Sequence, residues 1–566
     1  MVLPTDDLER VLCQRFGYQR FRPGQRRAIQ TLLNGRDVLA IFPTGAGKSL
    51  VYQLAAQLLP GATLVVSPLL ALMKDQQDAL LERGLQVSAI NSTLSEREAA
   101  EALQAVQAGQ AKLLYVTPER FDDADFVAAM SSVDVSLLVV DEAHCISEWG
   151  HSFRPSYLNL GESARRLGRP TLLALTATAT PWVRADIIDR LGMHEPSVVV
   201  RGIDRPNLFL EVVRVEEERE DKRVLHHLLC PDSAAATDTD APAPGLAAAM
   251  GGCGIVYCAT TRSAQETAAW LREWGIAADY YHGQRRKADR ARVQDAFMAG
   301  ALRVITATNA FGMGIDKPDI RFVIHRDIPA NLEAYYQEAG RAGRDGELAR
   351  CTLIYRPGDV GRAAFLSATS QLSRDAVVLA WASLRAKPRL SLGELQEATR
   401  TSRGDALRLA ETLAAAGVVR AARGRLRLLV DDFDPQTISL EQEERRRAYE
   451  RSRLEMMRGY AEARGCRRAY VLSYFGEVEP VERCGQCDND THVGPLPAAE
   501  PVEPAAEVVL PFGPRDRVRH PGWGEGTVQR IAGETVTVLF DSVGYKTLAT
   551  ELVLEQDLLT RSSPAV

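Results

Sequence analysis

A glycine-rich segment near the N-terminus has the residue types that bind phosphate groups. The sequence FPTGAGKS at residues 42–49 follows a short apolar run and precedes a helical pattern. Backbone N–H groups of such a loop at a helix N-terminus attract anions, because the helix dipole and the unpaired donors act together. Lys48 would then contact the β- and γ-phosphates of ATP, and the Ser49 hydroxyl would bind Mg²⁺. A glycine-rich turn that binds nothing is the alternative.

Two adjacent carboxylates follow a buried-strand pattern further along the chain. In LLVVDEAHC at residues 137–145, four apolar residues precede Asp141 and Glu142. The carboxyl ends of strands in an α/β sheet are where such proteins bind ligands. Asp141 is therefore a candidate Mg²⁺ ligand, and Glu142 is a candidate to orient and deprotonate an attacking water. A solvated acidic strand end is the weaker alternative, because the phosphate loop lies upstream in a matching context.

A third segment, YYQEAGRAGRDG at residues 335–346, carries two arginines three residues apart. The spacing predicts that Arg341 and Arg344 share one helical face. If a second α/β domain closes on the first, both guanidinium groups can reach the γ-phosphate and stabilise the transition state, an effect of about 10³–10⁵ in rate. Gln337 is expected to orient the nucleophile or sense closure. A solvent-exposed basic helix is the alternative.

Alternating apolar runs and helical patterns predict the elements that position these segments. Two sets of buried parallel strands indicate two α/β domains in tandem. Residues 231–252 are rich in Ala, Pro and Gly without periodicity, so we expect a disordered insertion there. The strands are expected at 38–42, 63–67, 112–117, 137–140 and 171–175 in the first set, and at 254–258, 304–307, 321–325 and 351–355 in the second.

The chain changes character after about residue 370. Residues 374–430 predict a winged-helix domain whose two-stranded wing turns at Arg423 and Gly424. A charged helical segment then leads to a cysteine cluster, and a Pro/Ala/Glu-rich linker leads to a small all-β barrel. The expected elements are helices at 392–398, 403–416 and 440–464 and β segments at 526–531, 535–540 and 545–548.

Composition limits the class of protein. The chain has 566 residues, 46% of them hydrophobic, which suffices for several cores. The net charge is −6, so a nucleic-acid surface must be a local basic stripe. Nine cysteines, three of them clustered, favour a metal site in a reducing compartment over a disulfide framework. Without a signal-peptide pattern or a membrane-length apolar run, we expect a cytoplasmic, nucleoid-associated protein with no membrane partner.

Eight motifs occur in a fixed order, and as a set they resemble the RecQ branch of superfamily 2 DNA helicases. The likeness spans about residues 8–362 and resumes near Cys466. It implies two RecA-like lobes that bind ATP between them and move 3′-to-5′ along single-stranded DNA. The motifs are FRPGQ (21–25), PTGAGKS (43–49), SPLLALMKDQ (67–76), TPER (117–120), DEAHCISEWGHSFRPSY (141–157), LTATAT (175–180), TATNAFGMGIDKPDIRFVIH (306–325) and QEAGRAGRDG (337–346).

This resemblance assigns further roles. Gln25 is expected to read adenine, because its amide can both donate to and accept from the base. His144, Thr176 and Thr178 are expected to couple the nucleotide state to DNA. The aromatic-rich loop after the paired acids is expected to stack on unpaired bases, worth about 1–3 kcal/mol per base; an aromatic turn buried in the core is the alternative. Other expected ATP-site residues are Phe21, Arg22, Thr44, Gly45, Ala46, Gly47 and Asp316.

DNA contacts are expected on both the motor and the winged helix. Hydroxyl, amide and lysine groups of lobe 1 would bind the phosphate backbone without reading sequence. Arginines of the winged helix would neutralise duplex phosphates, so binding would weaken with salt. A solvated basic hairpin or a protein-docking domain is the alternative. The residues are Ser67, Pro68, Lys74, Gln76, Thr117, Arg120, Trp149, His151, Phe153, Arg154, Arg403, Arg408, Arg423 and Arg425.

The cysteine cluster resembles the RecQ zinc module, which normally presents four cysteines. Cys466, Cys484 and Cys487 match, whereas Asp490 stands at the fourth position. A carboxylate is an acceptable Zn²⁺ ligand, and His492 is the competing candidate. A decayed site with packed thiols is the alternative. The winged helix precedes this module, although RecQ enzymes normally carry it afterwards.

The C-terminal segment VRHPGWGEGTVQRI resembles the Tudor-like barrel of some superfamily 1 repair helicases, where the barrel docks on RNA polymerase. RNA polymerase or a repair protein is therefore an expected partner, beside single-stranded and forked or duplex DNA. The expected domains are lobe 1 at 1–203, lobe 2 at 204–362, the winged helix at 370–432, the helical zinc module at 436–490, a linker at 491–513 and the barrel at 514–562.

Three functions fit these features. The first is an ATP-dependent 3′-to-5′ DNA helicase in repair or recombination that uses ATP, Mg²⁺ and structural Zn²⁺. The second is an ATP-driven DNA translocase or remodeller that does not separate strands. The third is a non-catalytic DNA-structure adaptor, which the full set of nucleotide-site residues disfavours. The FRPGQ and WGHSFRP segments disfavour an RNA helicase.

Overall fold

The computed structural model divides the chain into two compact units. One unit comprises Met1–Arg356 with Tyr460–Glu503, and the other comprises Pro357–Gly459 with Pro504–Val566. The structure describes all residues except 1–4, 44, 69, 92–93, 95, 148–153, 202, 231–250, 313–316, 360, 362–371, 423, 431, 478–482, 492–509, 533–534 and 563–566.

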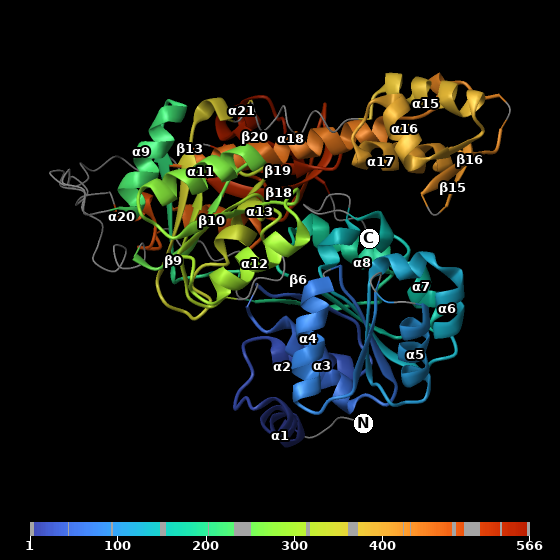
Figure 1. Ribbon diagram of the computed structural model, residues 1–566. Helices are drawn as coiled ribbons and strands as arrows, with labels where there is room; N and C mark the ends of the chain where they lie inside the picture. Colours follow the sequence, from blue (N-terminus) through green and yellow to red (C-terminus); the bar gives the residue numbers. More distant parts are fainter. Residues whose placement is uncertain are drawn as a thin grey trace. The chain divides into compact units, whose positions relative to one another are not determined.

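Lobe 1, blue to teal in Figure 1, is built on a seven-stranded parallel sheet of order β3-β4-β2-β5-β6-β1-β7. All five predicted strands are confirmed to within two residues, and β3 and β7 are additional. The strands are β1 (Val38–Ile41), β2 (Ala62–Val66), β3 (Val87–Ile90), β4 (Leu113–Val116), β5 (Val135–Val140), β6 (Thr171–Thr176) and β7 (Ser197–Val200).

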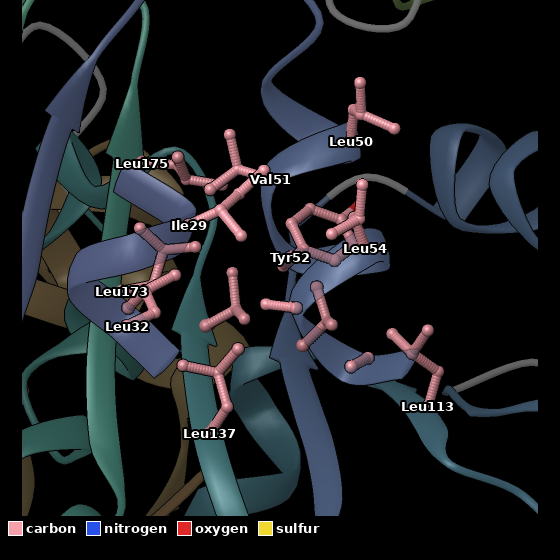
Figure 2. Close-up of a cluster of buried hydrophobic side chains, with 14 of the residues drawn as sticks. Ile29, Leu32, Leu50, Val51, Tyr52, Leu54, Leu113, Leu137, Leu173 and Leu175 are labelled. Carbon is pink, nitrogen blue, oxygen red and sulfur yellow. The ribbon is translucent and has the colours of Figure 1, made fainter. Parts of the chain in front are cut away.

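Helices cover the lobe 1 sheet and complete one apolar core. Figure 2 shows Ile29 and Leu32 of one helix beside Leu173 and Leu175 of β6. The central strands are mostly apolar because both faces of a parallel sheet are buried. The helices are α1 (Thr5–Phe16), α2 (Gln25–Leu33), α3 (Lys48–Leu58), α4 (Leu70–Glu82), α5 (Glu96–Gln107), α6 (Ala124–Met130), α7 (Leu160–Arg166) and α8 (Pro181–Leu191), with 3₁₀ turns η1 (Pro118–Asp122), η2 (Ala143–Ile146) and η3 (Pro155–Tyr157).

Lobe 2 has a six-stranded parallel sheet of order β10-β11-β9-β12-β13-β8. The four predicted strands are confirmed, and β8 and β10 are additional. The predicted insertion at 231–252 lies almost wholly outside the described residues. The elements are β8 (Leu208–Arg214), α9 (Glu218–Leu229), β9 (Cys253–Tyr257), α11 (Thr261–Glu273), β10 (Ala278–Tyr281), α12 (Lys287–Met298), β11 (Val304–Ala307), β12 (Ile320–His325), α13 (Leu332–Ala339) and β13 (Ala349–Tyr355).

The cysteine module belongs to the same unit as the two lobes. Its helices α19 (Arg467–Tyr474) and α20 (Asp488–Thr491) lie against β8. Leu210 of β8 forms an isolated parallel bridge with Cys487, and the Val212 N–H donates to Asp488 over 2.9 Å. The module therefore extends the edge of the lobe 2 sheet.

The second unit begins with three helices and a three-stranded antiparallel sheet of order β14-β16-β15. The predicted helices at 392–398 and 403–416 and the hairpin at Gly424 are confirmed. Ser373, Ser391 and Ser402 cap the three helices with their hydroxyl groups. The elements are α15 (Arg374–Ala386), β14 (Arg389–Ser391), α16 (Leu392–Thr399), α17 (Arg403–Ala415), β15 (Val419–Ala422) and β16 (Arg425–Leu428).

A long helix and a C-terminal sheet complete the second unit. A turn, η4 (Pro435–Thr437), precedes α18 (Glu441–Ala461), whose last two residues fall in the first unit. The five strands are antiparallel in the order β20-β19-β18-β17-β21, and among the described residues the end strands are not paired with each other. The described residues thus establish an antiparallel sheet, and its closure into a barrel stays a prediction. Its elements are β17 (Arg517–His520), β18 (Gly524–Ala532), β19 (Thr535–Phe540), β20 (Gly544–Ala549), α21 (Thr550–Glu555) and β21 (Thr560–Arg561).

The C-terminal sheet contacts α18 at Gly544. A Cβ added there would lie 2.3 Å from the Ser452 hydroxyl oxygen, and the backbone φ is +74°. Only glycine suits both conditions. In the part of the chain that the structure describes, no helix is long and apolar enough to cross a membrane.

Candidate nucleotide and metal sites

The phosphate loop joins β1 to α3, where the sequence predicted it. Gly45 and Gly47 adopt φ values of +84° and +77°, which turn the chain so that the first N–H groups of α3 face the loop. Lys48 is the first residue of α3, and its ammonium group donates to the Phe42 carbonyl over 3.3 Å. The loop can therefore receive phosphate oxygens, with Lys48 and Ser49 at its base. Thr44 lies outside the described residues.

Gln25 and Arg22 lie against the phosphate loop. The Gln25 amide donates to the Ala46 and Gly47 carbonyls over 3.1 and 3.0 Å and accepts from the Arg22 N–H over 2.8 Å. The Arg22 guanidinium donates to the Gly45 carbonyl. Gln25 is thus buried, and its amide is bonded to the loop and to Arg22. Adenine recognition by this amide remains a prediction. Phe21 packs against the lobe 1 core.

Asp141 and Glu142 follow β5 and are both buried. The Ser67 hydroxyl donates to the Asp141 carboxylate over 3.3 Å. Burial, followed by the charge of Glu142, raises the pKa of Asp141 to about 7 against the opposing effect of Lys48. Two buried carboxylates with a single lysine nearby lack positive charge, so a divalent cation would stabilise them. The donor set fits Mg²⁺ at Asp141 and Ser49.

The coupling residues of the sequence analysis meet in one buried cluster. His144 lies on η2, directly after the paired acids, and its Nδ1 lies 2.9 Å from the Thr176 hydroxyl and 3.4 Å from the Glu142 carboxylate. The Thr176 hydroxyl donates to the Thr178 carbonyl over 3.0 Å. A change at Glu142 can therefore reach Thr178, after the end of β6, through three successive contacts.

Both ends of the aromatic-rich loop are fixed to the acidic segment. The Arg154 N–H donates to the Cys145 carbonyl over 2.9 Å, and the buried Tyr157 hydroxyl donates to the Asp141 carbonyl over 2.9 Å. Trp149, His151 and Phe153 lie outside the described residues. Sequence reasoning gave Tyr157 no role, although a tyrosine shortly after such a loop is well placed to anchor it.

The lobe 2 arginines do not share a helical face, so that prediction is wrong. Helix α13 ends at Ala339, and Gly343, with a φ of +57°, turns the chain between the arginines. Arg341 is buried and donates to the Gly312 carbonyl. A Cβ added to Gly45 would lie 3.3 Å from the Arg344 side chain, so Arg344 lies against the phosphate loop. Asp316 lies outside the described residues.

A small cavity opens between the lobes. Pro43 and Thr178 of lobe 1 line it together with Gln337 and Gly340 of lobe 2. The predicted nucleophile-orienting glutamine therefore lies between the phosphate loop and the segment after β6. From this position Gln337 could sense closure of the two lobes.

The predicted DNA-contact residues of lobe 1 lie in different environments. Lys74 is exposed, whereas Ser67 and Thr117 are buried. The contact between Ser67 and Asp141 ties that serine to the acidic pair. Gln76 accepts from Gln53 over 2.7 Å, and Arg120 pairs with Asp123 at 3.8 Å. Pro68 is half-buried. Their contacts with DNA remain predictions.

The arginines of the second unit divide into two groups. Arg403 is exposed at the start of α17, whereas Arg408 is ion-paired with the buried Asp405. In the three-stranded sheet, Arg427 lies directly opposite Arg389 and Arg420. These three and Arg425 are exposed, and the structure records no ion pair for them among the described residues. Arg423 lies outside those residues.

The three cysteines and Asp490 come together as a candidate metal site. One ligand atom from each lies within 4.8 Å of the others, which suits a tetrahedral centre with Zn–S distances of about 2.3 Å. Hydrogen bonds from Cys484 and Cys487 lower the pKa of Cys466, which favours a thiolate. One Asp490 oxygen also accepts from the Gly485 N–H over 3.1 Å. The set fits Zn²⁺, and His492 lies outside the described residues.

Family models match four parts of the chain. Residues 22–186 match the DEAD/DEAH box helicase model, and 244–346 match the helicase conserved C-terminal domain. Residues 424–491 match the RecQ zinc-binding model. Residues 512–555 match a model described as a protein of unknown function.

Curated helicases are similar to this chain in sequence, and a solved structure is similar to it in fold. The ATP-dependent DNA helicase RecQ of Bacillus subtilis (strain 168) is 35% identical over 502 residues, which cover 88% of this chain and 69% of that protein. The probable ATP-dependent DNA helicase RecS of the same strain is 41% identical over 355 residues, 62% of this chain and 67% of that one. A crystal structure of the DUF1998 helicase MrfA bound to DNA aligns with a TM-score of 0.50 at 17% identity, over 78% of this chain and 61% of that chain, a likeness of fold alone.

Proposed function

The chain belongs to the RecQ family of ATP-dependent DNA helicases, and we propose that it moves 3′-to-5′ along single-stranded DNA and separates duplex strands in repair or recombination. The observation that carries the proposal is the composite site. The phosphate loop and the paired acids lie on lobe 1, and Arg344 of lobe 2 lies against the loop at Gly45. Movement between the lobes can therefore make and break the complete site.

Lobe 1 binds and activates the reactants. The N-terminus of α3 and Lys48 hold the phosphate oxygens. Ser49 and Asp141 would hold Mg²⁺, which would neutralise phosphate charge when bound. Glu142 orients the attacking water and accepts its proton. Because Glu142 lies 3.4 Å from His144, the same carboxylate also communicates the nucleotide state to Thr176.

Lobe 2 completes the transition state. Arg344 supplies positive charge to the γ-phosphate, and Arg341 joins it if its bond to Gly312 opens on closure. Gln337 at the inter-lobe cavity helps place the water. Charge supplied at this point stabilises the transition state more than the ground state, which is what raises kcat.

The aromatic-rich loop couples hydrolysis to strand opening. Its anchors at Cys145 and Asp141 connect it to the acids that handle water and metal. Trp149 and Phe153 stack on unpaired bases, and each stacked base offsets the loss of about 1.4 kcal/mol per base-pair step in the duplex. Lys74, Gln76 and Arg120 hold the backbone of the tracked strand.

The second unit grips duplex DNA through a winged helix at residues 370–432. Arg389, Arg420 and Arg427 lie side by side, and like charges directly opposite each other repel. A phosphate backbone would relieve that repulsion, so the exposed face of this sheet is the DNA-binding face. Arg408 instead serves α17 through Asp405, and Arg403, Arg423 and Arg425 complete the basic surface.

Zinc held by Cys466, Cys484, Cys487 and Asp490 is structural and fastens α19 and α20 to lobe 2. The domains follow the boundaries predicted above. The C-terminal sheet is a Tudor-like barrel that recruits RNA polymerase or a repair protein, and the enzyme works in the cytoplasm at the nucleoid. The RecQ zinc-binding match over residues 424–491 supports the zinc assignment.

Strand separation on tailed duplexes tests the proposed function. We expect ATP-dependent unwinding of a fluorescent duplex with a 3′ single-stranded tail, and none of the same duplex with a 5′ tail. Lys48→Ala should abolish it, because the ammonium group that binds the phosphates is removed. ATP turnover without unwinding of either duplex would favour a translocase that leaves strands paired. Binding without turnover would favour a non-catalytic adaptor.

A further inference from the structure

The two finger arginines lie in a stretch without regular secondary structure. Helix α13 ends at Ala339 and β13 begins at Ala349. Between them, single backbone hydrogen bonds, such as the one from the Gly343 N–H to the Ile320 carbonyl over 2.8 Å, replace the regular bonds of a helix or strand. An arginine finger must be placed to within about an ångström, because a misplacement of about 1 Å can reduce a rate about 100-fold. Something outside this stretch must therefore hold it.

Two side chains of residues 203–207, the segment that precedes β8 and is called the linker below, add to this support. The Arg205 guanidinium donates to the carbonyls of Gly340, Ala342 and Gly343 over 3.1, 2.9 and 2.8 Å. The Asn207 amide donates to the carbonyls of Gly343 and Glu347 over 2.8 Å each. These carbonyls flank Arg341 and Arg344 on both sides, so the linker sets the path of the chain that carries the fingers.

The linker is itself held by the zinc module. The buried Arg468 guanidinium, on α19, reaches the carbonyls of Arg205, Pro206 and Leu208 over 3.3, 3.1 and 3.1 Å. It also pairs with the Asp204 carboxylate at 3.4 Å. Arg468 comes two residues after Cys466, the candidate zinc ligand that caps α19. The hydrogen bonds thus run from the zinc module to the linker and from the linker to the finger stretch.

A second set of contacts joins the same module to α13. The Tyr335 hydroxyl lies 2.8 Å from the Tyr460 hydroxyl, at the end of α18. The neighbouring Tyr336 ring packs on Phe475, with centroids 5.7 Å apart, and its hydroxyl donates to the Ile203 carbonyl. Helix α13, which leads into the finger stretch, is therefore fixed on the side of the zinc module as well.

We propose that Arg468 and Arg205 are positioning residues for ATP hydrolysis, and that the zinc module acts through them to hold the arginine fingers in place. The proposal rests on the proposed function and gives the module a role in turnover beyond fastening helices. The Arg468 guanidinium is bonded to the linker, and Arg205, which lines the inter-lobe cavity, gives its guanidinium hydrogen bonds to the finger stretch. Their removal should lower kcat without weakening nucleotide binding, which lobe 1 supplies.

Turnover and nucleotide binding, measured separately on the full chain, test the proposal. For Arg468→Ala and Arg205→Ala we expect kcat with saturating single-stranded DNA to fall about 10- to 100-fold. The Kd of fluorescent ADP should stay close to that of the wild type. Adding aluminium fluoride tightens ADP binding by mimicking the transition state, and this gain should shrink by the same factor as kcat.

A matched control separates positioning from general damage to lobe 2. Arg350 is similarly buried in the lobe 2 sheet, but its recorded hydrogen bonds among the described residues go to Glu211. Arg350→Ala should lower the melting temperature and leave kcat and the aluminium fluoride gain nearly unchanged. Arg468→Lys keeps the charge opposite Asp204 without a guanidinium fork, and should recover part of kcat.

The outcomes are distinguishable. If the wild type does not turn over ATP, the proposed function fails. If the wild type is active and a folded Arg468→Ala keeps its kcat, the positioning role is excluded. It is also excluded if Arg350→Ala loses as much kcat as Arg468→Ala. If Arg468→Ala does not fold, Arg205→Lys gives the same test at the second step. The double variant should lose no more than Arg205→Ala alone, because both act on one chain of contacts.

Discussion

The nucleotide site has two walls, one formed by lobe 1 and one by lobe 2, and different kinds of contact hold each wall in place. On lobe 1, the acidic pair and its partners lie at the ends of neighbouring strands, and the contacts of Ser67 with Asp141 and of His144 with Thr176 stay within the lobe. On lobe 2, the finger stretch is held by the linker side chains Arg205 and Asn207. The lobe 1 side of the site is thus built from the ends of its sheet strands. The lobe 2 side instead depends on side chains of the segment before β8 and, through Arg468, on the zinc module.

Removing the finger charge should have the largest effect. Arg344→Ala is expected to lower kcat about 10³-fold or more, because the Arg344 side chain lies against the phosphate loop at Gly45. ADP binding should be little changed, since lobe 1 provides it. Phosphate release under saturating ATP and DNA measures the first quantity, and fluorescence titration measures the second.

Arg341→Ala sharpens this prediction. Arg341 is bonded to Gly312 inside lobe 2, so we expect a smaller loss than for Arg344→Ala unless closure releases it. An equal loss in the two variants would show that both arginines reach the phosphate in the active form. A loss in neither would remove lobe 2 from the chemistry.

Removing a phosphate-binding group of lobe 1 should affect binding and turnover together. Lys48→Ala is expected to lower turnover about 10²- to 10³-fold, the usual cost of losing one preorganised charge-stabilising group, and to weaken ATP binding as well. DNA binding without nucleotide should remain. Gel-shift and phosphate-release assays on one preparation check this. Unchanged ATP affinity would contradict the claim that lobe 1 supplies nucleotide binding.

Breaking a contact inside lobe 1 should uncouple the site from DNA. His144→Ala removes the bridge between Glu142 and Thr176. We expect DNA stimulation of ATP hydrolysis to fall about 10-fold, within the usual range for coupled sites, while hydrolysis without DNA changes less. Equal losses with and without DNA would instead assign His144 to the chemistry.

The smallest effect should come from a region that contributes to neither wall. Arg420→Ala with Arg427→Ala removes two neighbouring charges from the exposed sheet face of the second unit. Duplex affinity should fall, and the salt dependence of log Kd should decrease by about 0.9 for each DNA phosphate that the variant no longer neutralises. At saturating DNA, kcat should be unchanged. A changed kcat would connect this unit to hydrolysis.

The strands that sequence reasoning found and missed differ in position. The nine predicted strands of the two lobes include every interior strand, whose continuous apolar runs reflect burial on both faces. The four that were missed, β3, β7, β10 and β8, are the edges of their sheets. Edge strands pair on one side only, and β7 and β10 are partly exposed. Their short runs lack a periodicity that separates strand from loop or helix.

The residues of the nucleotide site also divide into those that the sequence predicted and those that it missed. The lobe 1 residues were predictable because loop, strand end and helix start follow one another in sequence. The roles of Arg205 and Arg468 were not, because each depends on contacts with residues far away in the chain. The role of Tyr157 was overlooked, although this residue closely follows the aromatic-rich loop. The arginine pair was assigned to a helix, since its spacing suits one; the intervening glycine, Gly343 at a φ of +57°, was the overlooked signal.

Phosphate release by the purified chain with Mg²⁺ and ATP, with and without single-stranded DNA, tests the composite site most directly. The account predicts turnover that DNA strongly stimulates, and its loss in Arg344→Ala even though that variant still binds ADP. Absence of turnover in the wild type with DNA present, or full turnover in Arg344→Ala, would contradict a site completed by the second lobe.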